Sequence, residues 1–440
     1  MMSPPYPLSP PSWPGLAHGC PVEFCRSFDL HRFDSMMALL GGHGHEKGRT
    51  MKHRNSVLHG MLGYLPWQVF DDLVAAHGAD KWVRTLSTKC QFVALLIGQL
   101  SGFCGLRETV AGVNSQAGRL YHLGAREIAR STFADANAHR PSAVFEALFA
   151  ALVAQAGRGL RRTLDGTTYL IDSTSLRLNQ HSADWARYSA TVCGAKVHVI
   201  YDPNAAHPVY SAFSTATVND ISAAQVMPIV PGATYVFDLG YYDYGWWAEL
   251  QAADCRIVTR LKKNTPLTVT RERLIPPGGI ATSSATILSD RIGHLPARQA
   301  GRRSNPMSDE MREVRVRLDT GKVLRILTND LVSPAHEIAE IYKQRWQIEL
   351  FFRWIKQRLE IKRFIGTSEN AVRIQVAVAL IAFLLLRLAH AGQKAVPDLL
   401  AFVRGVRVHL LHRRDINALD SPERPPEIDP RQLSLEGCFA

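Results

Sequence analysis

The chain has 440 residues, of which 46% are apolar and 20% charged. This composition is typical of a globular protein, and the length allows two or three domains with at least one sizeable core. A formal net charge of +12 favours a polyanionic partner, although many basic proteins bind no nucleic acid. The seven cysteines form no CxxC pair and no zinc-finger spacing, so they indicate unpaired thiols in a reducing compartment.

Residues 1–50 differ from the rest of the chain. They are rich in proline, glycine and polar residues and show no periodicity, so we expect them to be disordered. They also lack the apolar segment of a signal peptide. Because globular patterning begins just after Met51, our hypothesis is that Met51 is the biological start and that the preceding residues are a mis-assigned extension.

Residues 51–158 have a helical pattern and are predicted to be a DNA-binding domain. Two amphipathic segments, 106–120 and 125–139, are separated by a short connector that contains a glycine, as in a helix-turn-helix. The second segment carries polar side chains suited to DNA: Arg130, Ser131, Thr132, Asn137, His139 and Arg140. The alternative is an ordinary pair of helices in a bundle, and the pattern alone does not decide between them.

The remainder reads as an α/β core with an insertion. Short runs rich in Val, Ile, Tyr and Thr predict the strands of a first core segment over 159–264. Residues 265–331 predict a β-rich insertion that ends in a hairpin at Thr320-Gly321. Residues 332–412 are helical, and 413–440 predict a loose tail. The apolar run 376–386 is too short to span a bilayer and predicts a buried helix, so no membrane partner is expected.

Two aspartates follow apolar runs in the first core segment. Asp172 comes after Tyr-Leu-Ile, and Asp238 comes after Tyr-Val-Phe. An acid is rare in a buried strand unless it has a partner. These two aspartates therefore favour a functional site. Each aspartate alone is more often a turn residue or a helix N-cap.

The segment 341–359 carries the most specific pattern. If it forms one helix, with about 100° per residue, then Tyr342, Arg345, Glu349 and Lys356 share an arc about 60° wide. A neighbouring arc is apolar and should be buried: Ile341, Ile348, Phe352, Ile355 and Leu359. The alternative is a solvated helix face with an Arg345–Glu349 ion pair.

Together, Asp172, Asp238 and Glu349 form a set of carboxylates that separate elements can bring together. Such a set is unfavourable without cations and suits two Mg²⁺ ions, for which Mn²⁺ can substitute. Two metal ions serve hydrolysis or transesterification of a phosphodiester. Tyr342, Arg345 and Lys356 would then contact the DNA phosphates beside the scissile bond.

The spacing of these last residues with Glu349 resembles the Tyr-(2)-Arg-(3)-Glu-(6)-Lys signature of bacterial insertion-sequence transposases of the DDE type. Their strands around the first and second aspartates resemble IDSTSLRL and FDLGYYDYGWWAEL. The resemblance implies an RNase H-like α/β core, a mixed sheet with helices, that has a β-rich insertion and follows a helical N-terminal domain. It also implies that Asp172, Asp238 and Glu349 are the catalytic metal ligands and that Tyr342, Arg345 and Lys356 contact the DNA end.

The expected function is therefore DNA transposition in the bacterial cytoplasm, at the nucleoid. The protein would bind the terminal inverted repeats of its element, cleave at the ends and join 3′-hydroxyls to target DNA, with double-stranded DNA as partner and a homodimer pairing the ends. A Mg²⁺-dependent nuclease of the same fold and a non-catalytic DNA-binding regulator are the alternatives. Weaker candidates for contacts near the metal ions or DNA are Lys196, His198, Trp246, Trp247, Lys262 and Lys263.

Overall fold

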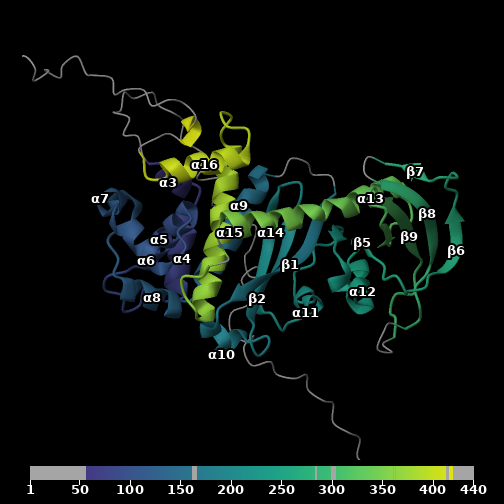
Figure 1. Cartoon of the computed structure of the whole chain (residues 1–440), viewed down its shortest axis with the longest axis horizontal. Coiled ribbons are helices and arrows are strands. Elements are labelled where there is room, and N and C mark those ends of the chain that lie inside the picture. Colours follow the sequence, from purple (N-terminus) through teal and green to yellow (C-terminus); the bar gives the residue numbers. More distant parts are fainter. Residues whose placement is uncertain are drawn as a thin grey trace, which may run out of the picture.

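The structure is a computed structural model that describes residues 56–160, 166–282, 285–298, 304–359, 361, 363–412 and 416–419. The hypothesis about residues 1–50 and most of the predicted tail lie outside these residues. Figure 1 shows helices from the N-terminal part at one end, a sheet in the middle and the strands of the insertion at the other end.

The N-terminal part is helical, as predicted. Its elements are α3 (Val57–Leu62), α4 (Trp67–Ala76), α5 (Thr88–Ser101), α6 (Leu106–Asn114), α7 (Ala117–Leu120), η1 (Tyr121–Leu123), α8 (Arg130–His139) and α9 (Ser142–Leu160). The second helix of the predicted helix-turn-helix begins at Arg130, five residues later than expected, because Gly124 takes a left-handed conformation at φ 73° and an extended connector follows it. The prediction of a tight turn was therefore wrong.

One mixed sheet forms the core. Its strands are β1 (Thr168–Leu178), β2 (Cys193–Asp202), β3 (His207–Thr215), β4 (Thr234–Val236), β5 (Arg256–Arg260), β6 (Thr268–Arg273), β7 (Ile280–Ala281), β8 (Ala285–His294), β9 (Met311–Leu318) and β10 (Val323–Thr328). They are ordered β3-β2-β1-β4-β5-β10-β9-β8-β6, with β7 paired to β8. β1 pairs with β2 antiparallel and with β4 parallel, and β4 pairs with β5 parallel. The carboxyl ends of β1, β4 and β5 therefore point the same way.

The insertion extends this sheet. β10 pairs antiparallel with β5, and β9 and β8 follow it outward. The β9–β10 hairpin turns at Gly321, whose φ of 79° favours glycine. The core strands and the insertion thus share one continuous hydrogen-bonded sheet.

Helices cover both faces of the core sheet. Alternation along β1 sends Leu170 to a core shared with α13 (Ala335–Gln344), α14 (Trp346–Arg358) and α15 (Glu369–Ala391), and Ile171 to the opposite core. The second core contains α11 (Asp220–Ala224), η3 (Leu239–Tyr241) and α12 (Tyr244–Ala252). The remaining short elements are η2 (Gln180–Ser182), α10 (Ala183–Ala186), α16 (Leu399–His409) and η4 (Ile416–Ala418).

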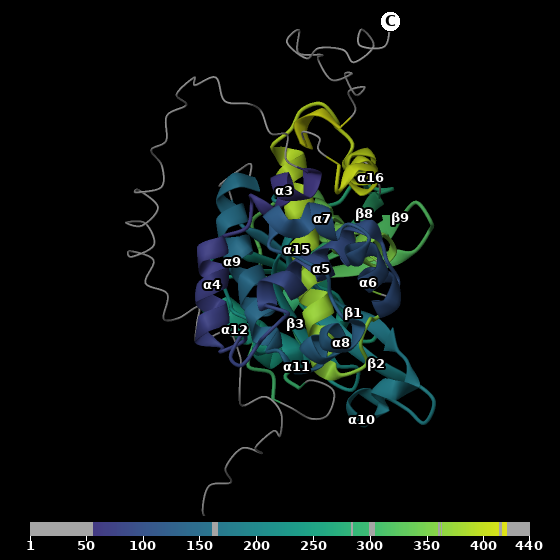
Figure 2. The same ribbon diagram turned by 90° about the vertical axis from the view of Figure 1, so that its left-hand side faces the viewer.

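Helix α15 joins the N-terminal helices to the core. It packs against α5, α8 and α9 as well as β3. Figure 1 shows it between the N-terminal helices and the sheet, and in Figure 2, where the N-terminal helices face the viewer, it runs upright. It is longer than its apolar run suggested and, by length and composition alone, is long enough to cross a membrane. However, 83% of its most apolar window is buried inside the protein, which agrees with the predicted buried helix.

Candidate active site

The two aspartates lie on neighbouring parallel strands. Asp172 is inside β1, and Asp238 follows β4 by two residues. Because Leu170 is level with Val236, continuing this register places Asp172 beside Asp238. Asp172 is on the same face of β1 as Leu170, which is the face against which α14 packs. The sheet thus presents both acids toward the elements that carry Glu349.

The predicted continuous helix is broken at Arg345. Helix α13 ends at Gln344 and α14 begins at Trp346. Around the break the backbone tightens, since the Arg345 N–H donates to the Tyr342 carbonyl at 3.1 Å and the Ile348 N–H donates to the Arg345 carbonyl at 3.3 Å. These bonds span three residues instead of four, so the angular phase computed for one uninterrupted helix does not hold across the break.

Burial along residues 341–359 differs from the prediction at one residue. All five apolar positions predicted to be buried are buried, from Ile341 to Leu359. Tyr342, which was expected on the polar arc, is also buried, with 7% of its surface exposed. Its ring lies 5.9 Å from the centre of the Arg345 guanidinium. Tyr342 thus lies mostly inside the protein, and its contact with the DNA end stays a prediction.

Arg345 brings the first and third acids together. Its guanidinium contacts Glu349 Oε1 at 2.5 Å and Asp172 Oδ2 at 3.6 Å. All three side chains are mostly shielded from solvent, with exposures of 16% for Arg345, 19% for Asp172 and 31% for Glu349. The Arg345–Glu349 ion pair of the alternative interpretation is thus present. However, it lies against Asp172 of β1 and not on a solvated helix face.

The pKa of Asp172 is influenced by the charge of the second acid, Asp238. Burial, together with the nearby charges of Asp238 and Glu349, raises the pKa of the Asp172 carboxyl to about 6, against the lowering effects of the Ser173 N–H and Arg345. The carboxylates of Asp238 and Glu349 are therefore both close enough to act on Asp172. Asp172 and Glu349 thus contact the same guanidinium, and the register of β1 and β4 places Asp238 beside Asp172.

This group of oxygen donors has the chemistry that a hard divalent cation prefers. Burial and two nearby carboxylates keep the pKa of Asp172 raised in spite of Arg345, and a cation would favour the charged form of this carboxyl. In the present arrangement, no group of three His, Cys, Asp or Glu side chains within the described residues is poised to hold a metal ion. Arg345 occupies the space between two of the acids, so its guanidinium must move aside for both to share a cation.

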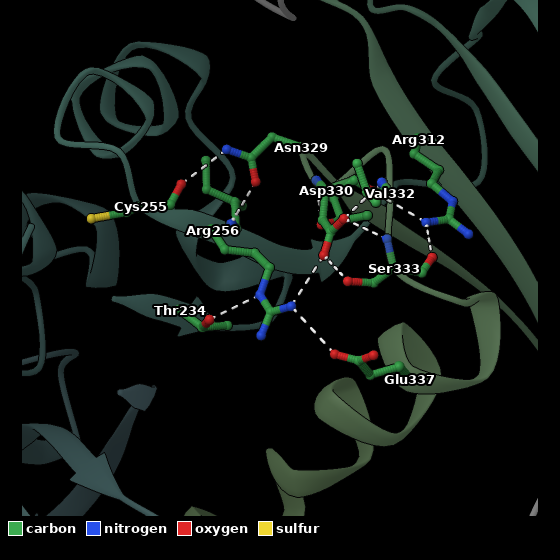
Figure 3. A network of polar contacts seen from close by, with 11 residues as sticks. Thr234, Cys255, Arg256, Arg312, Asn329, Asp330, Val332, Ser333 and Glu337 are labelled. Carbon is green, nitrogen blue, oxygen red and sulfur yellow. Dashed lines mark hydrogen bonds and ion pairs between the residues drawn. The ribbon is translucent and has the colours of Figure 1, made fainter. Parts of the chain in front are cut away.

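A polar network fixes the start of α13, and with it the direction of the helices that carry Glu349 (Figure 3). The Asp330 carboxylate accepts hydrogen bonds from the Val332 N–H, from the N–H and hydroxyl of Ser333, and from Arg256 on β5. Burial alone would raise the pKa of Asp330, but these donors hold it well below its usual range. The Asn329 side chain bonds the backbone of Cys255 and Ile257, so the loop before α13 is tied to β5.

Comparison with known proteins assigns the family. Residues 163–385, which contain all three acids, match the family described as the transposase DDE domain. The chain is 40% identical over 298 residues to the transposase y4zB of Sinorhizobium fredii, a span of 68% of this chain and 81% of that protein. The chain belongs to the DDE transposases of bacterial insertion sequences. The expected RNase H-like α/β fold class, with a mixed sheet and a helical N-terminal region, is confirmed.

Further known proteins are similar to this DDE transposase. The transposase of insertion sequence element IS5377 from Geobacillus stearothermophilus is 28% identical over 270 residues, covering 61% of this chain and 69% of that protein. A solved piggyBac transposase synaptic complex with hairpin DNA has a TM-score of 0.43 at 11% identity, with 83% of each chain covered. Residues 53–126 match a domain of unknown function.

Two residues predicted to face DNA in the N-terminal part of the transposase are internal. The Arg140 guanidinium donates to the Gln91 side chain at 2.9 Å, and Gln91 in turn donates to Asn137 at 2.8 Å. Asn137 is 2% exposed and Arg140 is 7% exposed. Their prediction as DNA contacts was wrong because a buried polar network looks, in sequence, like a polar helix face. Arg130, Ser131 and His139 are exposed.

The weaker candidates in the core also have defined places. Trp246 and Trp247 are buried in the second core, where they pack with Phe237. Lys262 and Lys263 are exposed, and the Lys262 ammonium lies 4.2 Å from the centre of the Tyr242 ring. Lys196 and His198 pair opposite Ser175 and Ser173, which places them on the face of the sheet away from the Asp172 side chain.

Sequence reasoning missed two charged residues beside the acids. Arg260, at the end of β5, lies close enough to Tyr342 for its charge to influence the Tyr342 hydroxyl. Asp220, at the start of α11, accepts a hydrogen bond from Ser173, the residue after Asp172. Arg260 had a usable signal, because it ends a strand parallel and adjacent to β4, whereas the contact of Asp220 is visible only in three dimensions.

Proposed function

We propose that this DDE transposase binds the terminal inverted repeats of its own element, cleaves the DNA at the ends and joins the 3′-hydroxyls to target DNA. The observation that supports this most is the meeting of Asp172, Asp238 and Glu349 from three separate elements. Acids brought together at such an energetic cost are typical of a site that works with cations.

In this proposal, Asp172, Asp238 and Glu349 hold two Mg²⁺ ions. When bound, these ions lower the pKa of the attacking hydroxyl and offset the charge on the leaving oxygen of an in-line phosphodiester displacement. Mn²⁺ satisfies the same oxygen donors. The four-residue Tyr-Arg-Glu-Lys signature remains a prediction from the sequence.

Arg345 has two roles in this scheme. Without a cation it compensates Asp172 and Glu349, with contacts of 3.6 Å and 2.5 Å. If cations compensated these two acids, the planar guanidinium of Arg345 would be free to bind a DNA phosphate through two parallel hydrogen bonds. Tyr342 lies against this guanidinium and orients it from the buried side. Lys356 lies about two turns of α14 beyond Glu349 and would hold a phosphate farther from the scissile bond.

The DNA partner follows from the same chemistry. A net charge of +12 supports binding to the phosphates of element ends and of target DNA. The exposed Arg130, Ser131 and His139 of α8 offer one DNA-contacting surface in the helical N-terminal part. A homodimer would bring two element ends together, and we place the protein in the bacterial cytoplasm, at the nucleoid, where its substrate lies.

A strand-transfer assay tests the function. The protein is incubated with a pre-cut element end, a target plasmid and Mg²⁺, and joined products are separated on a gel. We expect Asp172→Asn, Asp238→Asn and Glu349→Gln to lose joining by about 1,000-fold while end binding stays within about threefold, because each change removes a metal ligand and keeps the shape. The matched control is Asp243→Asn, which changes a carboxyl that caps α12.

The assay also separates the alternatives. Cleavage by the unchanged protein without any joined product would favour a Mg²⁺-dependent nuclease. Binding of the ends without cleavage would favour a DNA-binding regulator. Joining that survives all three substitutions would remove the assignment of the site.

A further inference from the structure

A fourth carboxylate, Asp220, lies behind the two strand acids. It is the first residue of α11, which packs against η3 directly after Asp238. Its Oδ1 accepts a hydrogen bond from the Ser173 hydroxyl at 2.8 Å. Its Oδ2 faces Gly240, where an added Cβ would lie 3.4 Å from it and 3.0 Å from Asp238 Oδ1. Asp220 therefore bonds the residue next to Asp172 and lies beside a residue two places after Asp238.

The same two residues orient the strand acids. The Ser173 N–H donates to Asp172 Oδ1 at 2.8 Å, and the Gly240 N–H donates to Asp238 Oδ1 at 2.8 Å. Each acid thus accepts a hydrogen bond from the backbone N–H of a residue that Asp220 bonds or lies beside. Since β1 and β4 are neighbouring strands, Asp220 spans the gap between the backbones that carry Asp172 and Asp238.

Lys196 balances the charge of Asp220. Its ammonium donates to Asp220 Oδ1 at 3.0 Å and to the Val218 carbonyl at 3.0 Å, which ties β2 to the loop before α11. His198 lies near, with Nδ1 3.8 Å from Asp220 Oδ1, but burial lowers its pKa to about 4 and it stays neutral at pH 7. Oδ1 of Asp220 is therefore engaged by Lys196 and Ser173.

We propose that Asp220 is a positioning residue that sets the separation and orientation of the Asp172 and Asp238 carboxylates through Ser173 and Gly240. This inference rests on the proposed function of these two acids as metal ligands. Asp220 acts through hydrogen bonds and packing and is not itself a ligand, because Lys196 already neutralises it. Residues that orient metal ligands typically contribute about 10- to 100-fold to metal affinity.

The test measures Mn²⁺ binding to the full chain without DNA, from the electron paramagnetic resonance signal of the free ion. We expect Asp220→Ala to weaken Mn²⁺ affinity by about tenfold, because Ser173 loses its acceptor and the turn at Gly240 loses its neighbour. Asp220→Asn keeps an acceptor oxygen in the same place, so its affinity should stay within about threefold of the unchanged protein. Asp243→Asn is the matched control and should leave affinity unchanged.

A second variant guards against a folding defect. Ser173→Ala removes only the hydroxyl that links β1 to Asp220 and keeps the N–H that orients Asp172. It should weaken Mn²⁺ binding by about threefold while the melting temperature stays within about 2 °C of the unchanged protein. If Asp220→Ala lowers the melting temperature strongly, the Mn²⁺ affinity of Ser173→Ala decides the test.

The outcomes are distinct. Equal losses in Asp220→Asn and Asp220→Ala would show that the charge acts directly and would overturn the positioning role. Wild-type affinity in both Asp220→Ala and Ser173→Ala would overturn it as well. By contrast, an unchanged protein that binds no Mn²⁺, or binds it equally well with Asp172→Asn, would overturn the proposed function and not the role of Asp220 alone.

Discussion

At the scale of single residues, burial of the Asp172 carboxylate destabilises the folded protein. Its pKa rises from 3.8 to about 6 on folding, chiefly because the carboxyl is buried. A carboxyl with a raised pKa takes up a proton on folding, so its contribution to stability falls as pH rises through this window. At neutral pH the buried anion opposes folding by roughly 2–3 kcal/mol, since one pKa unit is about 1.4 kcal/mol.

Asp172→Asn should therefore stabilise the metal-free protein above pH 6. We expect an increase of about 1–2 kcal/mol in the free energy of unfolding at pH 8, less than the full cost because Arg345 loses a charged partner, and little change at pH 4. Urea unfolding at both pH values measures it. Asp71→Asn, on an exposed position of α4, is the control. A variant that is equally destabilised at pH 4 and pH 8 would contradict the buried-anion explanation.

The strand aspartates became candidates because an acid after an apolar run is costly, and Glu349 became one because of its spacing from Tyr342, Arg345 and Lys356. Asp220 could not, because Asn-Asp before a short helix is an ordinary capping sequence. Its importance arises from Lys196 and Ser173 on two neighbouring strands, and register is set by the whole sheet.

At the scale of elements, the break at Arg345 and the loop before α13 decide where Glu349 points. Periodicity predicted the apolar face correctly, since packing selects it along both helices. It could not predict the break, because the shift to bonds that span three residues depends on the surroundings of Arg345. Likewise, the sequence showed that the insertion is β-rich. It did not show that β10 pairs with β5, because this pairing joins strands that are far apart in the sequence.

Asp330→Ala should destabilise the junction between the insertion and α13. Four donors lose their acceptor, including Arg256, so we expect a loss of about 2–4 kcal/mol in the free energy of unfolding at pH 7. Because the pKa of Asp330 is held low, its contribution is present above the ordinary carboxyl range and is lost only in strong acid.

Asp319→Ala, at the exposed tip of the β9–β10 hairpin, is the matched control for this change and should have an effect below about 0.5 kcal/mol. Thermal and urea unfolding of both variants compare the two positions. Equal stability of Asp330→Ala and Asp319→Ala would mean that the network in Figure 3 does not hold the start of α13.

At the scale of the whole molecule, the N-terminal helices and the catalytic core share one hydrophobic core. Apolar residues from Val57 to Leu152 belong to the same buried cluster as the apolar side chains of α14 and α15. Sequence patterns suggested a separate helical domain, since local composition changes near residue 160. They could not show that α15, more than 200 residues later, is covered by α5, α8 and α9.

This shared core predicts that the catalytic part cannot fold alone. A fragment of residues 166–412 would expose the face of α15 that α5, α8 and α9 cover, and exposed apolar surface of this size drives aggregation. We expect the fragment to be insoluble or to bind a hydrophobic dye strongly. Co-expression with a fragment of residues 56–160 should restore a soluble complex, because the missing helices return to the same surface. A soluble, cooperatively unfolding 166–412 fragment would instead show that the two parts are independent domains, and α15 would then have to be covered in some other way.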